Sequence, residues 1–361
     1  MLILGIESSC DETSASVIEA DKDRITVRSN AIFSQIGIHA LYGGVVPEIA
    51  SRAHADTISS LTYEALREAK CTIKDIELVA VTSNPGLIGA LLVGVNFAKS
   101  LAFSNNIPLV AVDHIKGHIA ASYIDTDGGE TAVPPFIALA VSGGHTAIYL
   151  AESRTRFSLL GSTRDDAMGE SFDKIGRMIG IPYPAGAGFD RLAEQGFRKA
   201  SPDAKDFYSA FASSAAHRDP AMHLPSPAIK DGSLDLSFSG LKTAAINLIH
   251  RFEQKGDELP RELFAAEYTY QAVEAVTEKI SDAMDRHPGL PLVVAGGVAA
   301  NSHLRHALSL LASKKNVKLI IPPVRLCGDN AAMIAAQGYY EYKDGHIAAS
   351  TLNASAEDSA I

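Results

Sequence analysis

The stretch LILGIESSCDETSASVIEA, residues 2–20, decides the fold, because its scheme returns in FIALAVSGGHTAIYL, residues 136–150. Each stretch has an apolar run, a short turn of serine with acids or with glycines, and a second apolar run. Such a pattern predicts a β-hairpin. A duplicated hairpin predicts two similar lobes, each offering one turn to a shared cleft, whereas two unrelated hairpins are the alternative.

The composition agrees with a two-lobed globular protein. A chain of 361 residues is longer than a usual single domain, and 47% hydrophobic with 20% charged residues supplies an ample core. The formal net charge of −10 gives no general attraction to nucleic acid, so RNA binding would need a local basic face.

The cysteines and the apolar segments bear on the compartment. Cys10, Cys71 and Cys327 form no paired framework, which is typical of a reducing compartment. The N-terminus lacks a basic leader and predicts a first strand, so we expect a cytoplasmic protein. Residues 87–103 are apolar but shorter than the roughly 20 residues that span a bilayer, which predicts a buried helix and no membrane association.

Periodicity places further elements along the chain and predicts an α/β fold. The predicted strands are 2–6, 15–20, 25–33, 78–82, 109–112, 136–141, 147–150, 234–238 and 292–295, and the predicted helices are 48–70, 87–103, 164–180, 262–283, 302–313 and 331–342. We expect a first lobe of residues 1–132 plus 329–361. The second lobe is expected at 133–328, with a mainly helical insert around 160–288.

A histidine pair follows one of these strands in VAVDHIKGH, residues 110–118. His114 and His118 are four residues apart at a predicted helix start, so both imidazoles share one helical face. Two imidazoles with a third ligand from elsewhere suit a metal that keeps open positions. The best carboxylate is Asp329, expected at the junction of an apolar strand and a small-residue helix.

Two glycine pairs follow apolar strands, in Ser142-Gly143-Gly144 and in Gly296-Gly297. A glycine pair lets backbone amides approach a phosphate that a side chain would block. Neither turn matches the Walker or the Rossmann fingerprint, and each alone is more often structural than ligand-binding.

Eight motifs in order resemble those of the bacterial TsaD family of tRNA adenosine threonylcarbamoyltransferases, over residues 2 to about 345. They are 5–13 (GIESSCDET), 43–48 (GGVVPE), 114–118 (HIKGH), 141–146 (VSGGHT), 172–174 (FDK), 237–243 (SFSGLKT), 295–301 (AGGVAAN) and 328–330 (GDN).

The resemblance implies a duplicated actin-like, ribonuclease H-like two-lobed fold with the helical insert in the second lobe. It implies a divalent metal on His114, His118 and Asp329, with iron preferred and zinc as the alternative. It also implies that an adenine nucleotide or a threonylcarbamoyl adenylate enters the cleft. The threonylcarbamoyl group then passes to the exocyclic amine of the adenine just after the anticodon, in tRNAs that read codons beginning with A.

The same resemblance assigns substrate contacts and reveals one departure. The contacts fall on Ala140, Val141, Ser142, Gly143, Gly144, Asp173, Gly186, Asp190 and Asn301. Where the family usually has Pro-Gly-Gly, this chain has Pro184-Ala185-Gly186, so we expect the backbone at Ala185 to approach the ligand less freely.

The residue types also indicate a candidate general base and leave two alternative functions to compare. Asp11 or Glu12 is placed to take a proton from the amine or to orient it, although Asp11 could equally be a turn acid. A zinc peptidase needs Glu after the first histidine, where this chain has Ile115. An actin-like ATPase regulator would leave the histidine pair unexplained.

The resemblance also implies macromolecular partners. They are tRNA, a paralogous actin-like subunit (TsaB) and a small ATPase (TsaE). The apolar helices at 48–70 and 87–103 are candidate contact faces, although burial in the lobe core is the simpler explanation.

Overall fold

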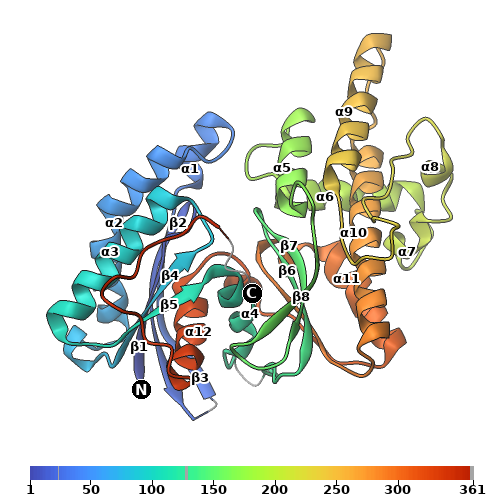
Figure 1. The fold of residues 1–361 in the computed structure, drawn as a ribbon. Coiled ribbons are helices and arrows are strands. Elements are labelled where there is room, and N and C mark those ends of the chain that lie inside the picture. Colours follow the sequence, from blue (N-terminus) through green and yellow to red (C-terminus); the bar gives the residue numbers. More distant parts are fainter. Residues whose placement is uncertain (23, 127–128, 358–361) are drawn as a thin grey trace.

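The computed structural model describes residues 1–22, 24–126 and 129–357 and arranges them as two lobes side by side (Figure 1). The last four residues of the predicted first lobe, 358–361, lie outside the described part of the chain. The domain boundaries at 132/133 and 328/329 stay a prediction.

The first sheet is built from the N-terminal hairpin and two later strands. Its strands are β1 (Leu2–Glu7), β2 (Glu12–Asp21), β3 (Arg24–Ser34), β4 (Leu78–Asn84) and β5 (Leu109–Asp113). They lie in the order β3-β2-β1-β4-β5. The pairs of β1 with β2 and β2 with β3 are antiparallel, whereas β1 with β4 and β4 with β5 are parallel.

The second sheet repeats this topology strand for strand. Its strands are β6 (Phe136–Val141), β7 (Thr146–Ala151), β8 (Phe157–Ser162), β9 (Leu292–Ala295) and β10 (Leu319–Ile320). They lie in the order β10-β9-β6-β7-β8, with β6, β7 and β8 antiparallel and β6, β9 and β10 parallel. The duplication predicted from the two hairpins is confirmed.

Helices cover both sheets and fill the insert. The α-helices are α1 (Ile36–His39), α2 (Pro47–Glu68), α3 (Ile88–Asn105), α4 (His114–Ala120), α5 (Met168–Met178), α6 (Gly186–Ala200), α7 (Phe207–Phe211), α8 (Ala215–Arg218), α9 (Phe238–Lys255), α10 (Arg261–Arg286), α11 (Ser302–Lys315) and α12 (Ala331–Lys343). Short 3-10 turns are η1 (Ala40–Tyr42), η2 (Ile73–Asp75), η3 (Ala121–Tyr123), η4 (Gly297–Ala300) and η5 (Val324–Leu326).

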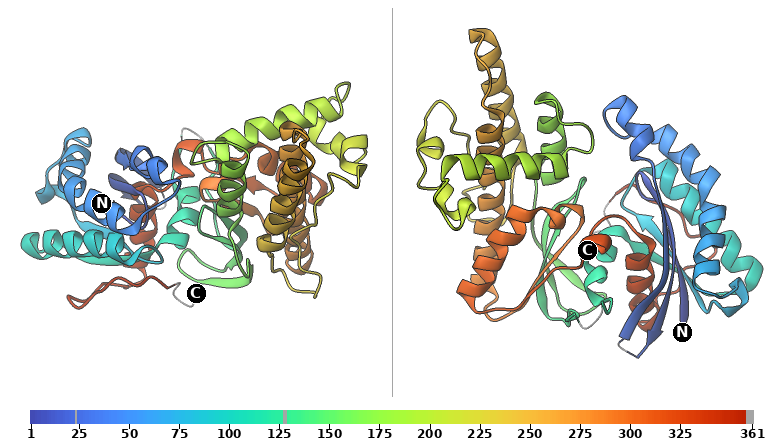
Figure 2. Two further views of the ribbon diagram at one scale, coloured as in Figure 1. Left: turned by 90° about the horizontal axis from the view of Figure 1, so that it is seen from above. Right: turned by 180° about the vertical axis from the view of Figure 1, so that it is seen from behind.

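Helix α12 returns from the second lobe to the first sheet, on the side that faces the second lobe (Figure 2). Two glycines allow it to lie close to the strands. A Cβ on Gly5 would stand 2.2 Å from the Ala331 carbonyl oxygen, and one on Gly338 would stand 2.4 Å from the Ala80 Cβ. Asn330, the residue before this helix, is therefore held at the carboxyl ends of β1 and β5.

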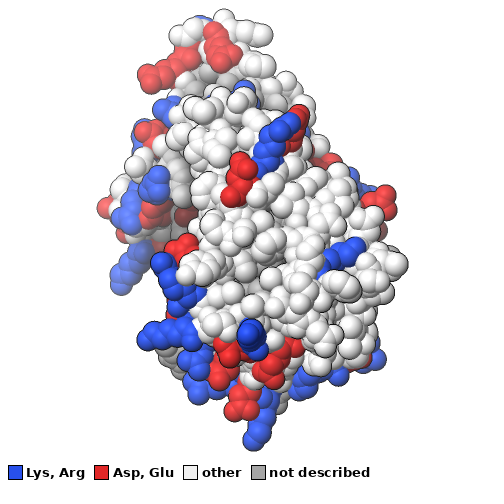
Figure 3. Space-filling model, turned by 90° about the vertical axis from the view of Figure 1, so that its left-hand side faces the viewer, with Lys and Arg blue, Asp and Glu red and all other residues white. Residues whose placement is uncertain are grey.

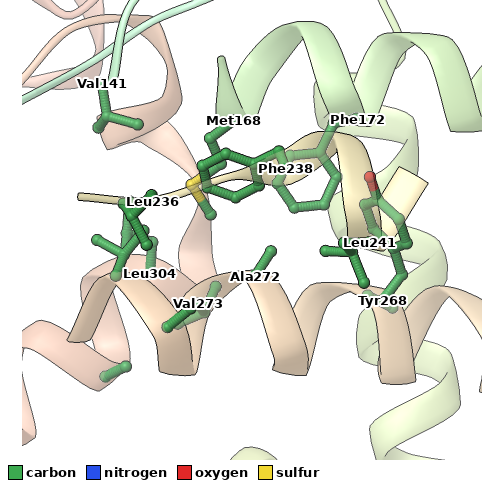
Figure 4. Close-up of a cluster of buried hydrophobic side chains, with 14 of the residues drawn as sticks. Val141, Met168, Phe172, Leu236, Phe238, Leu241, Tyr268, Ala272, Val273 and Leu304 are labelled. Carbon is green, nitrogen blue, oxygen red and sulfur yellow. The ribbon is translucent and has the colours of Figure 1, made fainter. Parts of the chain in front are cut away.

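The insert has its own apolar core around α10 (Figure 4). Phe172 from α5, Phe238 from α9 and Tyr268 from α10 are each at most 4% exposed. Rings in this layer meet edge to face, as Phe172 and Tyr268 do at 5.6 Å between centroids. Because this core is continuous with Val141 and Leu304, the insert holds the β6–β7 turn and α11 in fixed positions.

Two local predictions are wrong, and one strand was missed. Residues 234–238 form no strand, because only Leu236 makes isolated bridges and Phe238 already begins α9. Strand β8 was not predicted. Helix α5 begins at Met168 rather than Arg164, since Asp165 lies outside it and accepts from the Ser239 N–H of α9 at 3.1 Å.

Helix α3 meets the length and composition of a membrane-spanning segment, and among the described residues no other helix does. Its inner face packs on the first sheet through Val95 and Ala98, as the prediction of a buried helix requires. Its outer face differs from that prediction, because Ile88 is 48% and Phe103 is 88% exposed.

Candidate metal centre and substrate site

The histidine pair is set by the junction of β5 and α4. The Asp113 carboxylate accepts from the N–H groups of Ile115 at 2.8 Å and Lys116 at 3.1 Å, so it caps the helix at its first turn. His114 therefore opens the helix and His118 lies one turn later on the same face, with ring centroids 4.5 Å apart.

Asp329 meets both imidazoles from the far end of the chain. Its Oδ1 is 3.5 Å from His114 Nε2 and 3.2 Å from His118 Nε2. The neighbouring Asn330 caps α12 by accepting from the Met333 N–H, which fixes the turn that carries Asp329. The turn follows η5 rather than a strand, since β10 ends at Ile320, and this corrects the predicted strand-to-helix junction.

A buried carboxylate orients His114 from the opposite side. Glu7 is fully buried at the end of β1, and its Oε2 lies 3.1 Å from His114 Nδ1. Thr82 donates to the same oxygen at 2.6 Å, and Ser9 lies 3.2 Å from the same imidazole nitrogen. A carboxylate behind an imidazole fixes the orientation of its ring, so Nε2 of His114 is directed at Asp329.

The charges of the cluster favour a cation. Burial opposes ionisation of Asp329, but the two histidines hold the pKa of that carboxyl well below its usual value. Burial also opposes protonation of His114, but Glu7 and Asp329 raise the pKa of its imidazole well above the usual value. Burial and the adjacent His114 lower the pKa of His118, which leaves that imidazole neutral.

The donor set fits a divalent metal. Both ring nitrogens of the buried His118 lack a hydrogen-bond partner among the described residues, although Asp329 Oδ1 is only 3.2 Å from Nε2. That contact is close but poorly aligned for a hydrogen bond, whereas lone pairs converging on one point suit a metal ligand set. All three ligand atoms lie within 4.8 Å of one another.

Two further acids lie beside this centre, and only one is suited to accept a proton. Burial and the negative charges of Asp329 and Asp11 raise the pKa of Glu12 to about 9. Glu12 is therefore protonated at neutral pH and donates rather than accepts. Asp11 is 8% exposed, and the Tyr183 hydroxyl of the second lobe donates to its Oδ2 at 3.5 Å.

The β6–β7 turn presents backbone rather than side chains. Ala140 and Val141 are buried in strand β6, and Ser142 is 8% exposed with its N–H bonded to the His145 carbonyl at 2.8 Å. Gly143 and Gly144 are exposed, and a Cβ on either would meet nothing within 4 Å. Their openness agrees with an anion-binding turn, which stays a prediction.

The other predicted substrate residues mostly cap helices. Asp173 accepts from the Ala185 N–H at 2.7 Å, both Asp190 oxygens lie 3.2 Å from the Ser302 N–H, and Asn301 accepts from the Leu304 N–H at 2.9 Å. Gly186 is exposed at the start of α6. The side-chain oxygens of Asp173, Asp190 and Asn301 can still accept further hydrogen bonds. Substrate contact by these residues stays a prediction.

The side chain of the unusual Ala185 is buried. Its side chain is 1% exposed and lies in the core of the insert, and a Cβ on Gly176 would stand 2.4 Å from the Ala185 Cβ. Its φ of −79° is ordinary for alanine. The methyl group therefore packs inside the insert, and the expected effect of Ala185 on backbone approach to the ligand stays a prediction.

Sequence reasoning missed Glu7 and Tyr183 as members of the site. Glu7 was visible as an acid ending an apolar strand, but its partner His114 is 107 positions away. Tyr183 carries no spacing signal, because its contact with Asp11 depends on how the lobes face each other.

Comparison with known proteins agrees with this geometry. The family model described as tRNA N6-adenosine threonylcarbamoyltransferase (TsaD) matches residues 26–336. A protein of that name from Lacticaseibacillus casei is 44% identical over 98% of this chain and 96% of its own length. Its namesake from Bacillus cereus is also 44% identical, over 98% of this chain and 95% of its own length.

Solved structures resemble this chain in fold. HypF from T. kodakarensis has a TM-score of 0.58 at 12% identity, over 96% of this chain and 48% of its own. Component A of (R)-2-hydroxyglutaryl-CoA dehydratase from Acidaminococcus fermentans has a TM-score of 0.50 at 15% identity, over 95% of this chain and 99% of its own.

The duplicated sheets and these neighbours define a two-lobed α/β protein of the actin-like class, as predicted. Within that class, the chain belongs to the family of tRNA N6-adenosine threonylcarbamoyltransferases. The predicted resemblance is thus confirmed, the chain is grouped with transferases, and neither the zinc peptidase nor the ATPase regulator is favoured.

Proposed function

We propose that this chain transfers the threonylcarbamoyl group of threonylcarbamoyl-AMP to the exocyclic amine of the adenine just after the anticodon in tRNA. The observation that carries the proposal is the convergence of His114, His118 and Asp329, with ligand atoms within 4.8 Å, in a chain of this family.

The reaction requires charge to be stabilised on two groups. The amine nitrogen attacks the carbamoyl carbon, the bond from that carbon to the phosphate oxygen breaks, and AMP leaves as the amine loses a proton. A divalent cation on His114, His118 and Asp329, iron by preference and zinc as the alternative, supplies Lewis-acid polarisation and a template.

The protein's own groups would serve the phosphate and the proton. Neither Gly143 nor Gly144 donates its N–H to another described residue, so both amides are available to an adenylate phosphate. Asp11 is the acceptor for the amine proton, because the protonated Glu12 cannot accept one. Tyr183 orients Asp11 from the opposite lobe.

Contacts connect the turn to the metal centre. The Gly169 and Glu170 N–H groups of α5 donate to Ser142 and Gly143 carbonyl oxygens at 3.3 and 3.0 Å. Farther along α5, Asp173 caps the segment that follows Tyr183, and Tyr183 reaches Asp11. A series of contacts therefore runs from the glycine turn through α5 and Tyr183 to Asp11, and it would help to orient the adenylate and the proton acceptor for attack on the carbamoyl carbon.

We propose the face made by α2 and α3 as the docking surface for the actin-like companion subunit. It shows a broad area with few charges (Figure 3), and Tyr63, Ile88 and Phe103 are 70%, 48% and 88% exposed on it. Large exposed apolar side chains in such an area are typical of a protein interface. The small ATPase and the cytoplasmic location stay predictions.

The proposal is tested by reconstitution. Purified chain, tRNA, threonylcarbamoyl-AMP and the companion proteins are combined, and modified adenosine is measured by mass spectrometry. Modified adenosine is expected with wild type and is expected to be lost with Asp329→Ala. Robust modification in reactions lacking this chain would contradict the proposal.

A further inference from the structure

A second group of metal-ligating side chains lies in the helical insert, apart from the site described above. His217 belongs to α8, His223 follows in the next loop, and Glu267 projects from α10. One ligand atom of each lies within 4.8 Å of the others, which is the same criterion that His114, His118 and Asp329 meet.

The two imidazoles approach the two oxygens of one carboxylate. His217 Nδ1 is 2.7 Å from Glu267 Oε2, and His223 Nδ1 is 3.3 Å from Glu267 Oε1. In a tetrahedral site with bonds of about 2.0–2.1 Å, neighbouring ligand atoms are about 3.3 Å apart. The separation at His223 matches this value, and the hydrogen bond from His217 to Oε2 would have to lengthen for an ion to enter.

The carboxylate is buried and held in place. Glu267 is 1% exposed, and its Oε1 also accepts from the Leu224 N–H at 3.1 Å and from Gln271 Nε2 at 3.0 Å. Tyr270 fixes the His217 ring by an edge contact at 4.8 Å between centroids. Such supporting contacts around ligands are what a metal site uses to set orientation.

The fourth side of the cluster is open. The His223 side chain is 54% exposed, and a hollow of about 560 Å³ is lined by Ala212, His217, Pro220 and His223. A water molecule can therefore reach an ion held by the three side chains. Two imidazoles, one carboxylate and a water form a donor set that suits Zn²⁺.

We propose that His217, His223 and Glu267 bind a Zn²⁺ ion with water as the fourth ligand, and that this ion fastens residues 214–224 to α10. The ion bridges a short helix and an exposed loop to a buried helix, so its effect is structural. It is distinct from the ion at the junction of the lobes, because its ligands belong wholly to the insert.

Metal stoichiometry tests this proposal directly. Protein freed of metal by a chelator is dialysed against Zn²⁺, and bound zinc is counted by mass spectrometry. We expect about two equivalents for wild type, about one for His223→Ala, about one for His114→Ala and none for the double variant. His250→Ala, on the exposed face of α9, is the matched histidine control and keeps about two.

A second measurement reports on the loop. Hydrogen exchange of residues 214–224 should slow on adding Zn²⁺ to wild type and to His114→Ala, and should not change in His223→Ala. His223→Gln repeats the test with a bulkier polar side chain should the alanine variant not fold. The transferase activity of His223→Ala and of His223→Gln is expected to stay within about twofold of wild type. Failure of the zinc proposal is therefore separable from failure of the proposed function.

Two outcomes would overturn the proposal. One is a single equivalent in wild type that is lost in His114→Ala and retained in His223→Ala, which would make the cluster a hydrogen-bonded triad. The other is a second equivalent that survives both His223→Ala and His223→Gln.

Discussion

The β1–β2 turn and the β6–β7 turn occupy the same place in two sheets of the same topology, yet their chemistry is opposite. The first carries acids and hydroxyls, with Glu7 against His114 at the start of the turn and Asp11 beside Glu12 within it. The second carries Gly143 and Gly144, whose amides are exposed. The comparison teaches that a duplicated strand order can keep equivalent turns in place while their chemistry diverges, one towards acids and hydroxyls and the other towards open backbone.

Helix packing sustains this difference. In the first lobe, α12 brings Asp329 onto the sheet and completes the ligand set. In the second lobe, α4 packs on the corresponding face of the sheet, the insert packs on the opposite face, and α5 holds the glycine turn through bonds to its carbonyl oxygens. Five predictions test this difference between the two lobes, from the largest expected effect to the smallest.

Removing the metal ligand from the first lobe should have the largest effect. Asp329→Ala is expected to lower kcat/KM about 1,000-fold, since Lewis-acid stabilisation is worth several kcal/mol. Steady-state kinetics and metal content are measured together. Asp125→Ala, which removes only an ion pair with the exposed Arg24, is the control and should leave both unchanged. Full activity in metal-depleted Asp329→Ala would contradict the prediction.

Substitutions at the two acids of the β1–β2 turn, Asp11 and Glu12, should lower kcat to different extents. Asp11→Asn removes the proton acceptor and should lower kcat about 100-fold. Glu12→Gln mimics the protonated carboxyl that a pKa of about 9 implies, so its kcat should stay within about threefold. Single-turnover rates at neutral pH measure both. The reverse order, with Glu12→Gln the slower variant, would refute the assignment.

The carboxylate behind His114 should tune metal affinity. Glu7→Gln keeps the shape but loses the charge that orients the imidazole, and metal affinity should fall about 10- to 100-fold. Competition with a fluorescent chelator measures it. Glu341→Gln, a buried acid on α12 that contacts Gln337, is the matched control and should leave the affinity unchanged. Equal losses in both variants would point to general electrostatics instead.

The glycine turn of the second lobe should respond through substrate binding. Gly143→Ala has open space for its methyl group, so folding should be normal, but crowding of one backbone hydrogen bond to phosphate should raise KM about tenfold. Gly37→Ala, also open and exposed, is the control. A KM equal to wild type with normal metal content would remove the turn from the site.

The smallest effect on activity is expected at Ala185. Because its methyl group is buried against Gly176, Ala185→Gly should lower the free energy of unfolding by about 1 kcal/mol and leave kcat/KM within about twofold. Urea unfolding and kinetics measure the two quantities. A large rise in kcat/KM would show that the methyl group obstructs the ligand.

The fold could be predicted well because its signals are local. The two hairpins and most helices follow from periodicity within short windows, and α12 from its run of small apolar residues. Strand β8 was missed, and only its last three residues fall in the segment 160–288 interpreted as mainly helical. Residues 234–238 were taken as a strand because a short apolar run does not reveal whether it has a pairing partner, and only Leu236 finds one.

The candidate site could be predicted only where spacing or family resemblance supplied the link. The spacing of His114 and His118 predicts their shared helical face, whereas Asp329 is predicted only from its place before a helix and then from the family resemblance. Glu7 was missed because its partner is 107 positions away. The cluster of His217, His223 and Glu267 has no recognisable spacing, since Glu267 is 50 positions beyond His217 and reaches it only through packing of α10.

The central claim is that a cation lies where the first-lobe turn faces the second lobe, and anomalous diffraction at the absorption edge of the bound metal tests it most directly. The account predicts a peak bonded to the Nε2 atoms of His114 and His118 and to the Asp329 carboxylate. A metal-loaded, active protein with no peak at those three side chains would contradict it.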